Sequence, residues 1–122
     1  SNNLAAFSAA MNELGVANDV TAFTMSDFGR TLTSNGDGTD HGWGSHQVVV
    51  GGAVRGGDIY GAMPSLEIDG PDDIGGGRIV PRLSVDQYAA TLLRWFGLTE
   101  GQIDLAAPGL GAFTLRDLGF LA

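Results

Sequence analysis

The stretch that decides the predicted fold is residues 3–29, NLAAFSAAMNELGVANDVTAFTMSDFG. In its first half, apolar residues recur at spacings of three and four: Leu4, Phe7, Met11 and Leu14. This is the period of an amphipathic helix, so we expect a helix over residues 3–14 that stops at Gly15. The run from Val20 to Met25 is β-prone and lies between turn-forming residues, which predicts a buried strand that leads into a loop. A helix, a tight turn and a buried strand make one half of an α/β layer, so the sequence predicts the α/β class.

Beyond this stretch, short elements alternate with glycine-rich segments. Residues 33–44 are polar and rich in glycine, which predicts a loop rather than a core element. Residues 47–50 predict a strand, which is followed by glycine-rich turns. Residues 63–77 contain prolines, glycines and acidic residues, and we expect an irregular surface segment there. Residues 79–83 predict a short strand at an edge or in a bend, because Pro81 cannot donate to a neighbouring strand.

A second helix is predicted from Ser84 onward. Ser84 and Gln87 have the spacing of a capping box, in which each side chain accepts a hydrogen bond from the backbone of the other residue. We expect Gly97 to end this helix. Its predicted buried face consists of Val85, Tyr88, Ala89, Leu92, Leu93 and Phe96. Residues 98–122 alternate turns with apolar residues, which predicts a tail of short pieces that packs back on the core.

The composition limits the classes of protein to which this chain can belong. The chain has 122 residues, 43% of them hydrophobic, which is enough for a single domain over residues 1–122. It carries 14 acidic and 6 basic residues and a net charge of -8. Nucleic acid and anionic membranes attract positive charge, so this balance argues against both as partners. The chain has no cysteine, which excludes disulfides and thiolate chemistry, and no apolar stretch approaches the roughly 20 residues of a membrane span.

The polar side chains that are best suited to chemistry lie between residues 27 and 46. Both histidines, His41 and His46, fall within six residues of the chain, next to Asp40, and Asp27 follows the predicted buried strand. Imidazole nitrogen and carboxylate oxygen together suit zinc, manganese or iron. Loops at the carboxyl ends of strands are also where open α/β sheets bind their ligands.

Each of these residues also has a simpler interpretation. The two histidines can serve only to hydrogen-bond and close a polar loop. Asp27, with Ser26, can cap a turn of helix that begins near Phe28. Arg30 can bind an anionic group of a substrate through its fork of donors, or it can pair with one of the many carboxylates nearby. The residues alone leave these alternatives open.

Two segments, SDFGRT at 26–31 and NGDGTDHGWGSH at 35–46, resemble the C-terminal signature of a known family. It is the family called domain of unknown function 1501, in the alkaline phosphatase superfamily. Further segments resemble the family in the same order: Gly51-Gly52-Ala53-Val54, Gly56-Gly57, Ile59-Tyr60-Gly61, Ser84-Val85-Asp86-Gln87-Tyr88, Trp95-Phe96-Gly97 and Leu118-Gly119-Phe120. The resemblance therefore covers nearly the whole chain.

The resemblance implies a fold, a metal and a location. It implies that this chain is the C-terminal portion of an alkaline-phosphatase-like α/β/α sandwich with a mostly parallel sheet. Proteins of this superfamily include sulfatases and phosphatases that work with one or two divalent metals. Members of the family often begin with a twin-arginine export signal, which implies a periplasmic or extracellular location. The nucleophile and further metal ligands are then expected upstream of Ser1.

One departure from the superfamily affects the expected metal site. The loop after this strand often reads Asp-His in the superfamily, whereas Phe28 follows Asp27 here. The candidate ligands for zinc, manganese or iron are therefore the remaining four residues, Asp27, Asp40, His41 and His46, with Arg30 as the candidate substrate-binding residue.

Two functions follow from these observations. In the first, the chain is the C-terminal part of a metal-dependent hydrolase-like protein that acts on phosphate or sulfate esters. In the second, it belongs to a non-catalytic exported protein that serves structure or assembly and has a degenerate hydrolase fold. A central strand without sheet neighbours exposes its edges, so we expect the chain to associate with the upstream part of the same protein, with a complementary fragment or with a second copy.

Overall fold

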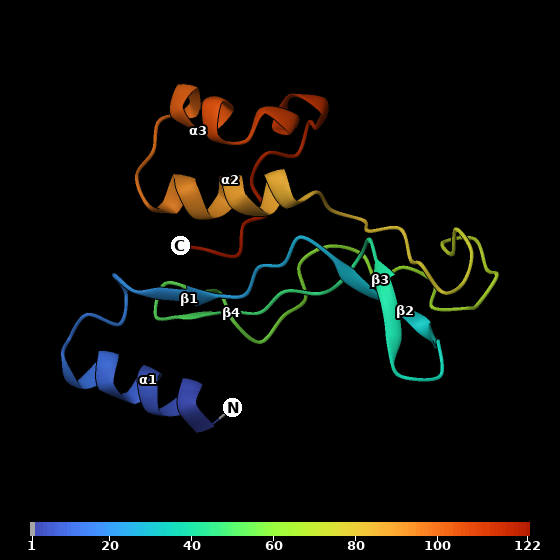
Figure 1. The fold of residues 1–122 in the computed structure, drawn as a ribbon. Coiled ribbons are helices and arrows are strands. Elements are labelled where there is room, and N and C mark those ends of the chain that lie inside the picture. The colour runs from blue at the N-terminus through green and yellow to red at the C-terminus, as the bar shows by residue number, and fades with distance from the viewer. Residues whose placement is uncertain (1) are drawn as a thin grey trace. The chain divides into compact units, whose positions relative to one another are not determined.

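The computed structural model describes residues 2–122 as helices and short strands joined by long irregular segments (Figure 1). In chain order these elements are α1 (Asn2–Glu13), β1 (Thr21–Phe23), β2 (Gly29–Ser34), β3 (Thr39–Gly42), β4 (Val49–Gly51), α2 (Val85–Trp95), α3 (Glu100–Ala106) and the 3-10 helix η1 (Pro108–Ala112). The predicted helix over residues 3–14 and the start of the second helix after Ser84 are confirmed. None of the helices in the described range combines the length and the apolar character that a bilayer crossing needs.

The chain divides into two compact units, and each is built from separated segments. The first unit contains the chain up to Thr24 together with Gln47–Tyr60 and Asp86–Ala122. The second unit contains Met25–His46 and Gly61–Val85. All three α-helices and the β1–β4 pair therefore belong to the first unit, apart from the first residue of α2, and the β2–β3 pair belongs to the second.

The expected alkaline-phosphatase-like sandwich with a mostly parallel sheet is wrong. Within residues 2–122, the paired strands form two separate two-stranded sheets, β1 with β4 and β2 with β3, and both pairs are antiparallel. The short turn after Ser34 permits only an antiparallel return, because a parallel neighbour needs a crossover of a dozen or more residues. The α/β/α layers implied by the resemblance are therefore not present in this part of the chain.

Two local predictions also need correction. Residues 33–44, predicted to be a loop, contribute the end of β2 and all of β3. In β2, Gly29 and Thr31 are buried and Thr33 is partly buried, so one face of this strand is packed. Residues 79–83 do not form a strand, and Ile79 makes only an isolated bridge with Asp73. The irregular character predicted for residues 63–77 is confirmed apart from that bridge.

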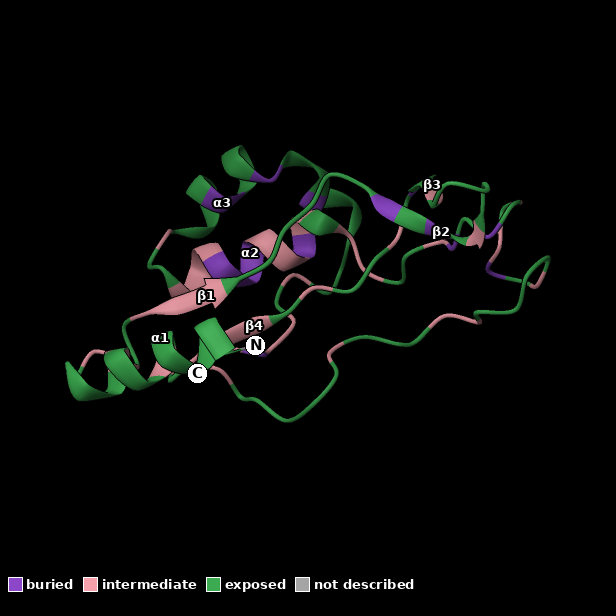
Figure 2. Ribbon diagram, turned by 60° about the horizontal axis from the view of Figure 1, so that its bottom comes forward, coloured by how far each residue is buried: buried purple, intermediate pink, exposed green. Residues whose placement is uncertain are grey.

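The buried core of the first unit lies between α2, α3 and η1. Four buried residues form it: Ala90, Ile103, Ala107 and Leu110. Thr99 precedes α3, and its backbone N–H donates to Oε1 of Gln102 at 2.9 Å, which satisfies one of the free donors at the start of a helix. Buried residues gather on α2, whereas α3 is exposed apart from Ile103 and α1 is exposed along most of its length (Figure 2).

The buried face of α2 differs from the predicted one. Val85 and Phe96 are exposed, whereas Gln87 and Thr91 are buried. The reason is hydrogen bonding to the C-terminal tail, since Gln87 Nε2 donates to the Leu115 carbonyl at 2.7 Å. In addition, Thr91 Oγ1 accepts a bond from the Leu118 N–H at 2.9 Å. Burial of these polar groups is tolerated because each has a partner.

In the second unit, the irregular segment that begins at Gly61 supports the β2–β3 hairpin. Leu32 N–H donates to the Gly77 carbonyl at 2.9 Å, and Thr33 Oγ1 donates to the Gly76 carbonyl at 2.6 Å. Asp73 holds the segment together, because its carboxylate accepts bonds from several backbone N–H groups. The bond from the Asp69 N–H is the main cause that holds the pKa of Asp73 below its ordinary value.

Candidate functional site

The β2–β3 hairpin carries the residues for which the sequence predicted a site. Its register places Gly29 opposite Gly42 and Arg30 opposite His41. Both glycines are buried, whereas Arg30 and His41 are exposed. A Cβ on Gly29 would overlap the Gly44 carbonyl, so glycine allows the chain to pack closely behind the hairpin. The hairpin therefore has one packed face and one face that presents Arg30 and His41 side by side to solvent.

Phe28 joins these two residues, and we call the three together the Arg30–His41 face. The rings of Phe28 and His41 stack with centroids 4.0 Å apart and an interplanar angle of 13°. The guanidinium carbon of Arg30 lies 5.4 Å from the Phe28 centroid, a cation–π contact worth about 0.5–1 kcal/mol at an exposed site. Nη1 of Arg30 donates to the Thr39 carbonyl at 2.8 Å. This bond and the ring contact fix the guanidinium against the hairpin.

The charge of Arg30 is not neutralised by the part of the chain that the structure describes. Arg82, Arg94 and Arg116 each pair with a carboxylate. No described carboxylate contacts the Arg30 guanidinium, although the chain has 14 acidic residues. The Arg30–His41 face therefore presents a cation together with the polar edge of an imidazole.

The four predicted metal ligands lie in different settings. Asp40 and His41 are consecutive residues of β3, and consecutive side chains of a strand point to opposite faces. Oδ1 of Asp40 accepts a bond from Nδ2 of Asn35 at 2.7 Å. Asp27 and His46 are exposed and lie outside the strands. Among residues 2–122, no three histidine, aspartate or glutamate side chains gather closely enough to hold a metal ion.

These donors alone do not form a complete metal centre. A catalytic zinc site usually has three protein ligands, so a metal bound here would need donors in addition to those that the structure brings together. The assignment of Asp27, Asp40, His41 and His46 as ligands of zinc, manganese or iron stays a prediction.

Phe28 is the residue of the site that the sequence did not single out. In the sequence, Phe28 stands out only as the replacement of a histidine expected from the superfamily. Its position two residues before Arg30 is the signal that predicts the contact, because residues two apart in a strand share a face. The partner that it stacks on, His41, could be found only from the cross-strand register.

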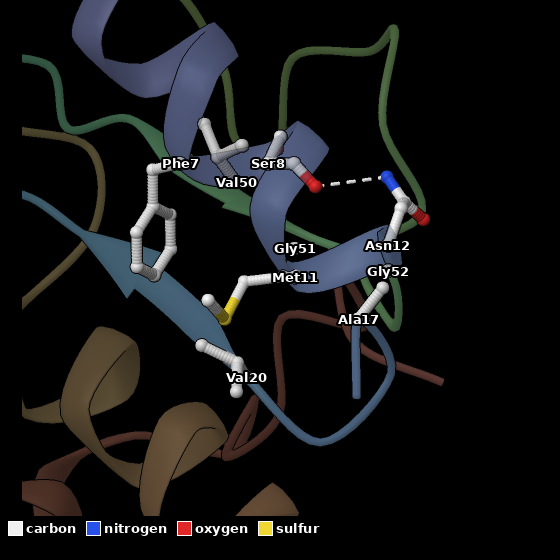
Figure 3. Close-up of a pocket in the computed structure, with 9 residues that line it drawn as sticks. All are labelled: Phe7, Ser8, Met11, Asn12, Ala17, Val20, Val50, Gly51 and Gly52. Carbon is white, nitrogen blue, oxygen red and sulfur yellow. Dashed lines mark hydrogen bonds between the residues drawn. The ribbon is translucent and has the colours of Figure 1, made fainter. Parts of the chain in front are cut away.

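The first unit contains a cavity that does not involve these residues. It has a volume of about 120 Å³, is partly open to solvent and lies between α1 and the β1–β4 pair (Figure 3). Phe7 and Met11 of α1 line it, together with Val20 and Val50. The described residues that line it are apolar or uncharged, and Ser8 and Asn12 are the polar ones among them.

Comparison with known proteins gives a family and no close relative. No curated protein and no solved structure is similar enough to this chain to count as a match. The family described as "Protein of unknown function (DUF1501)" matches residues 2–109, which is more than half of the chain and includes both strands of the hairpin. The chain therefore belongs to the DUF1501 family.

Proposed function

We propose that this chain is part of a hydrolase-like protein that acts on phosphate or sulfate esters, and that Arg30 binds the anionic group of the ester. The observation that supports the proposal is the Arg30–His41 face, where an arginine that pairs with no carboxylate among the described residues lies beside a histidine on an exposed hairpin. The planar fork of a guanidinium matches the geometry of tetrahedral oxyanions.

The contacts of Arg30 favour binding of a ligand over a role in stability. Nη1 bonds to the Thr39 carbonyl, so the side chain is held in place while its other donors remain available. His41, directly across the strand pair, adds a ring nitrogen that can donate to an ester oxygen or exchange a proton with it. A ligand that accepts hydrogen bonds from both residues would bind on this face of the hairpin.

Several finer parts of the proposal rest on the sequence resemblance. These are the relation to the sulfatase-like proteins of the alkaline phosphatase superfamily, the C-terminal position of this chain, and a periplasmic or extracellular location. The nucleophile and the additional metal ligands would come from upstream residues. Because the described donors do not gather into a metal centre, the proposal contains no step that passes through the metal.

The second candidate function is that of a non-catalytic exported protein that serves structure or assembly. One observation favours it: Phe28 covers a face of the His41 ring at stacking distance. It does so from the position where the superfamily often places a ligand histidine. In this alternative, the hairpin binds an anionic group without cleaving it.

The test compares two arginines of the second unit that have similar contacts. Arg30 and Arg78 each donate from Nη1 to a backbone carbonyl, and neither pairs with a described carboxylate, but only Arg30 lies beside His41. We expect Arg30→Gln to weaken the binding of inorganic phosphate or sulfate, followed by NMR titration, by about tenfold, which corresponds to one charge-assisted hydrogen bond. Arg78→Gln should leave the affinity unchanged.

The two functions are separated by turnover. Hydrolysis of an aryl phosphate or aryl sulfate by the full protein, supplied with zinc, manganese or iron and reduced by Arg30→Gln, supports the hydrolase. Anion binding without turnover under the same conditions supports the non-catalytic alternative. Equal anion affinity of the Arg30→Gln variant and the unaltered protein would refute the role of Arg30 in both.

A further inference from the structure

The turn of the β2–β3 hairpin contains an asparagine followed by a glycine, a pair in which the backbone can react with the asparagine side chain. Asn35 is followed by Gly36, and both residues are exposed. A glycine has no Cβ to obstruct its backbone nitrogen, so this nitrogen can approach the side-chain carbonyl of the preceding asparagine. Nothing lies within 4 Å of the position that a Cβ on Gly36 would occupy, so no neighbouring atom crowds this side of the glycine.

The attack of the Gly36 nitrogen on the side-chain carbonyl of Asn35 would change two nitrogen atoms, and both of them are hydrogen-bonded. The Gly36 N–H, the attacking group, donates to Ser34 Oγ at 3.1 Å. Nδ2 of Asn35, the leaving group, donates to Oδ1 of Asp40 at 2.7 Å. Each nitrogen therefore has an oxygen partner through which a proton can be exchanged with water, and proton transfer is what such an attack requires.

We propose that Asn35 is a site of spontaneous deamidation. The Gly36 nitrogen forms a bond to Cγ of Asn35, and the bond between Cγ and Nδ2 breaks. Nδ2 leaves as ammonia and carries away the proton that the Gly36 nitrogen gives up. The resulting cyclic imide takes up one water molecule, and the opening of one or the other of its C–N bonds leaves aspartate or isoaspartate at position 35. Water is the only co-reactant, and no electrons are transferred.

The fold sets the rate of this reaction through two contacts of the side chain. Oδ1 of Asn35 accepts a bond from the Asp37 N–H at 3.1 Å, and Nδ2 is held by Asp40. Ring closure must release both bonds. We therefore expect Asn35 to react more slowly in the folded protein than in the unfolded chain. We also expect it to react faster than the asparagines of the same protein that lack a following glycine.

The product changes the hairpin that carries the Arg30–His41 face. A carboxylate at position 35 has no N–H to donate, so Asp40 loses its partner and faces a like charge instead. Isoaspartate also adds an atom to the backbone between β2 and β3, next to the Ser34–Thr39 pair. Deamidation is therefore a one-way change of the turn that closes this hairpin.

The sequence suits a direct test by mass spectrometry. Cleavage after arginine releases residues 31–55, in which Asn35 is the one asparagine, and residues 1–30, which contain four asparagines, Asn2, Asn3, Asn12 and Asn18, none of them followed by glycine. The protein is incubated at mildly alkaline pH and then digested. We expect the gain in mass of an amide converted to an acid to accumulate in the 31–55 peptide ahead of the 1–30 peptide. Asn35→Gln, which would require a larger ring, should abolish the gain.

Three outcomes would overturn the proposal. The first is a 31–55 peptide from the folded protein that gains no mass even when incubation continues well beyond the time at which the same chain, unfolded in guanidinium chloride, has reacted completely. The second is an equal gain in both peptides, which would show no preference for Asn35. The third is a gain that persists in Asn35→Gln, which would show that the gain does not arise at Asn35.

Discussion

Gly77→Ala should disrupt the contact between β2 and the irregular segment that packs against the β2–β3 hairpin. The Gly77 carbonyl accepts the Leu32 N–H at 2.9 Å, so this glycine lies directly against β2. A Cβ on Gly77 would lie 2.8 Å from the Leu32 nitrogen and 2.9 Å from the Thr33 nitrogen. Both atoms belong to the backbone and cannot rotate away, so either β2 or the supporting segment must move.

Gly76→Ala is the matched control for this substitution. Gly76 has φ 66° and Gly77 has φ 73°, so alanine at either position adopts the left-handed conformation at a similar cost of about 1–2 kcal/mol. A Cβ on Gly76 would meet only the flexible end of Arg78, with its nearest atom at 3.2 Å. The difference between the two variants therefore isolates the clash with β2.

The expected difference follows from two contributions. Overpacking costs about 1–3 kcal/mol, and loss of the bond from Leu32 costs about 1 kcal/mol. We therefore expect Gly77→Ala to destabilise the hairpin by about 2–4 kcal/mol more than Gly76→Ala does. At the lower limit this corresponds to an equilibrium constant for opening of the hairpin that is about thirtyfold larger.

Amide hydrogen exchange followed by NMR provides the measurement, because the Leu32 N–H reports directly on the bond to Gly77. The Leu32 amide should lose protection in Gly77→Ala and keep most of it in Gly76→Ala. Equal protection of Leu32 in the two variants would refute the reasoning, since it would mean that the supporting segment absorbs a Cβ without disturbing β2.

Two further predictions concern the core and the acid range. Ile103 is 0% exposed and Leu105, in the same helix, is 85% exposed. In urea unfolding followed by circular dichroism, Ile103→Ala should lower the free energy of unfolding by about 2–5 kcal/mol, and Leu105→Ala should stay within about 0.5 kcal/mol of the unaltered protein. Similar losses would contradict the placement of the core. The pKa of Asp73 is lowered on folding, so the stability that its carboxylate contributes is complete above the ordinary value and is lost as the pH falls through the lowered value. Protection of the Gly75 amide, which donates to Asp73, should fall over that range and become independent of pH in Asp73→Asn; a fall that persists in the variant would point to another group.

The helices could be predicted from the sequence because their signals are local. Apolar residues three and four positions apart located α1, and the Ser84–Gln87 spacing located the start of α2. The buried face of α2 could not be predicted in the same way. It depends on the hydrogen bond that Gln87 donates to the tail and on the one that Thr91 accepts from it, each with a partner more than 20 positions away. Hydrophobicity alone gives no sign that polar residues on a helix have such partners.

The strands were harder to predict because their pairing is not local. The polar composition of residues 33–44 favoured a loop, whereas backbone pairing with β2 makes part of this segment a strand. The expectation of a parallel sheet came from the resemblance and not from a pattern in the residues. Arg30 and His41 were selected as candidates from their chemistry, but that they lie opposite each other follows only from the register.

The division of the chain into units has a consequence for any attempt to split the protein. The chain passes from one unit to the other after Thr24, His46, Tyr60 and Val85. A protease nick at any one of these junctions therefore cannot release an intact unit, and we expect the two products to remain associated. No contiguous gene fragment encodes the first unit without also encoding the second, so the first unit must be produced and studied as part of the whole.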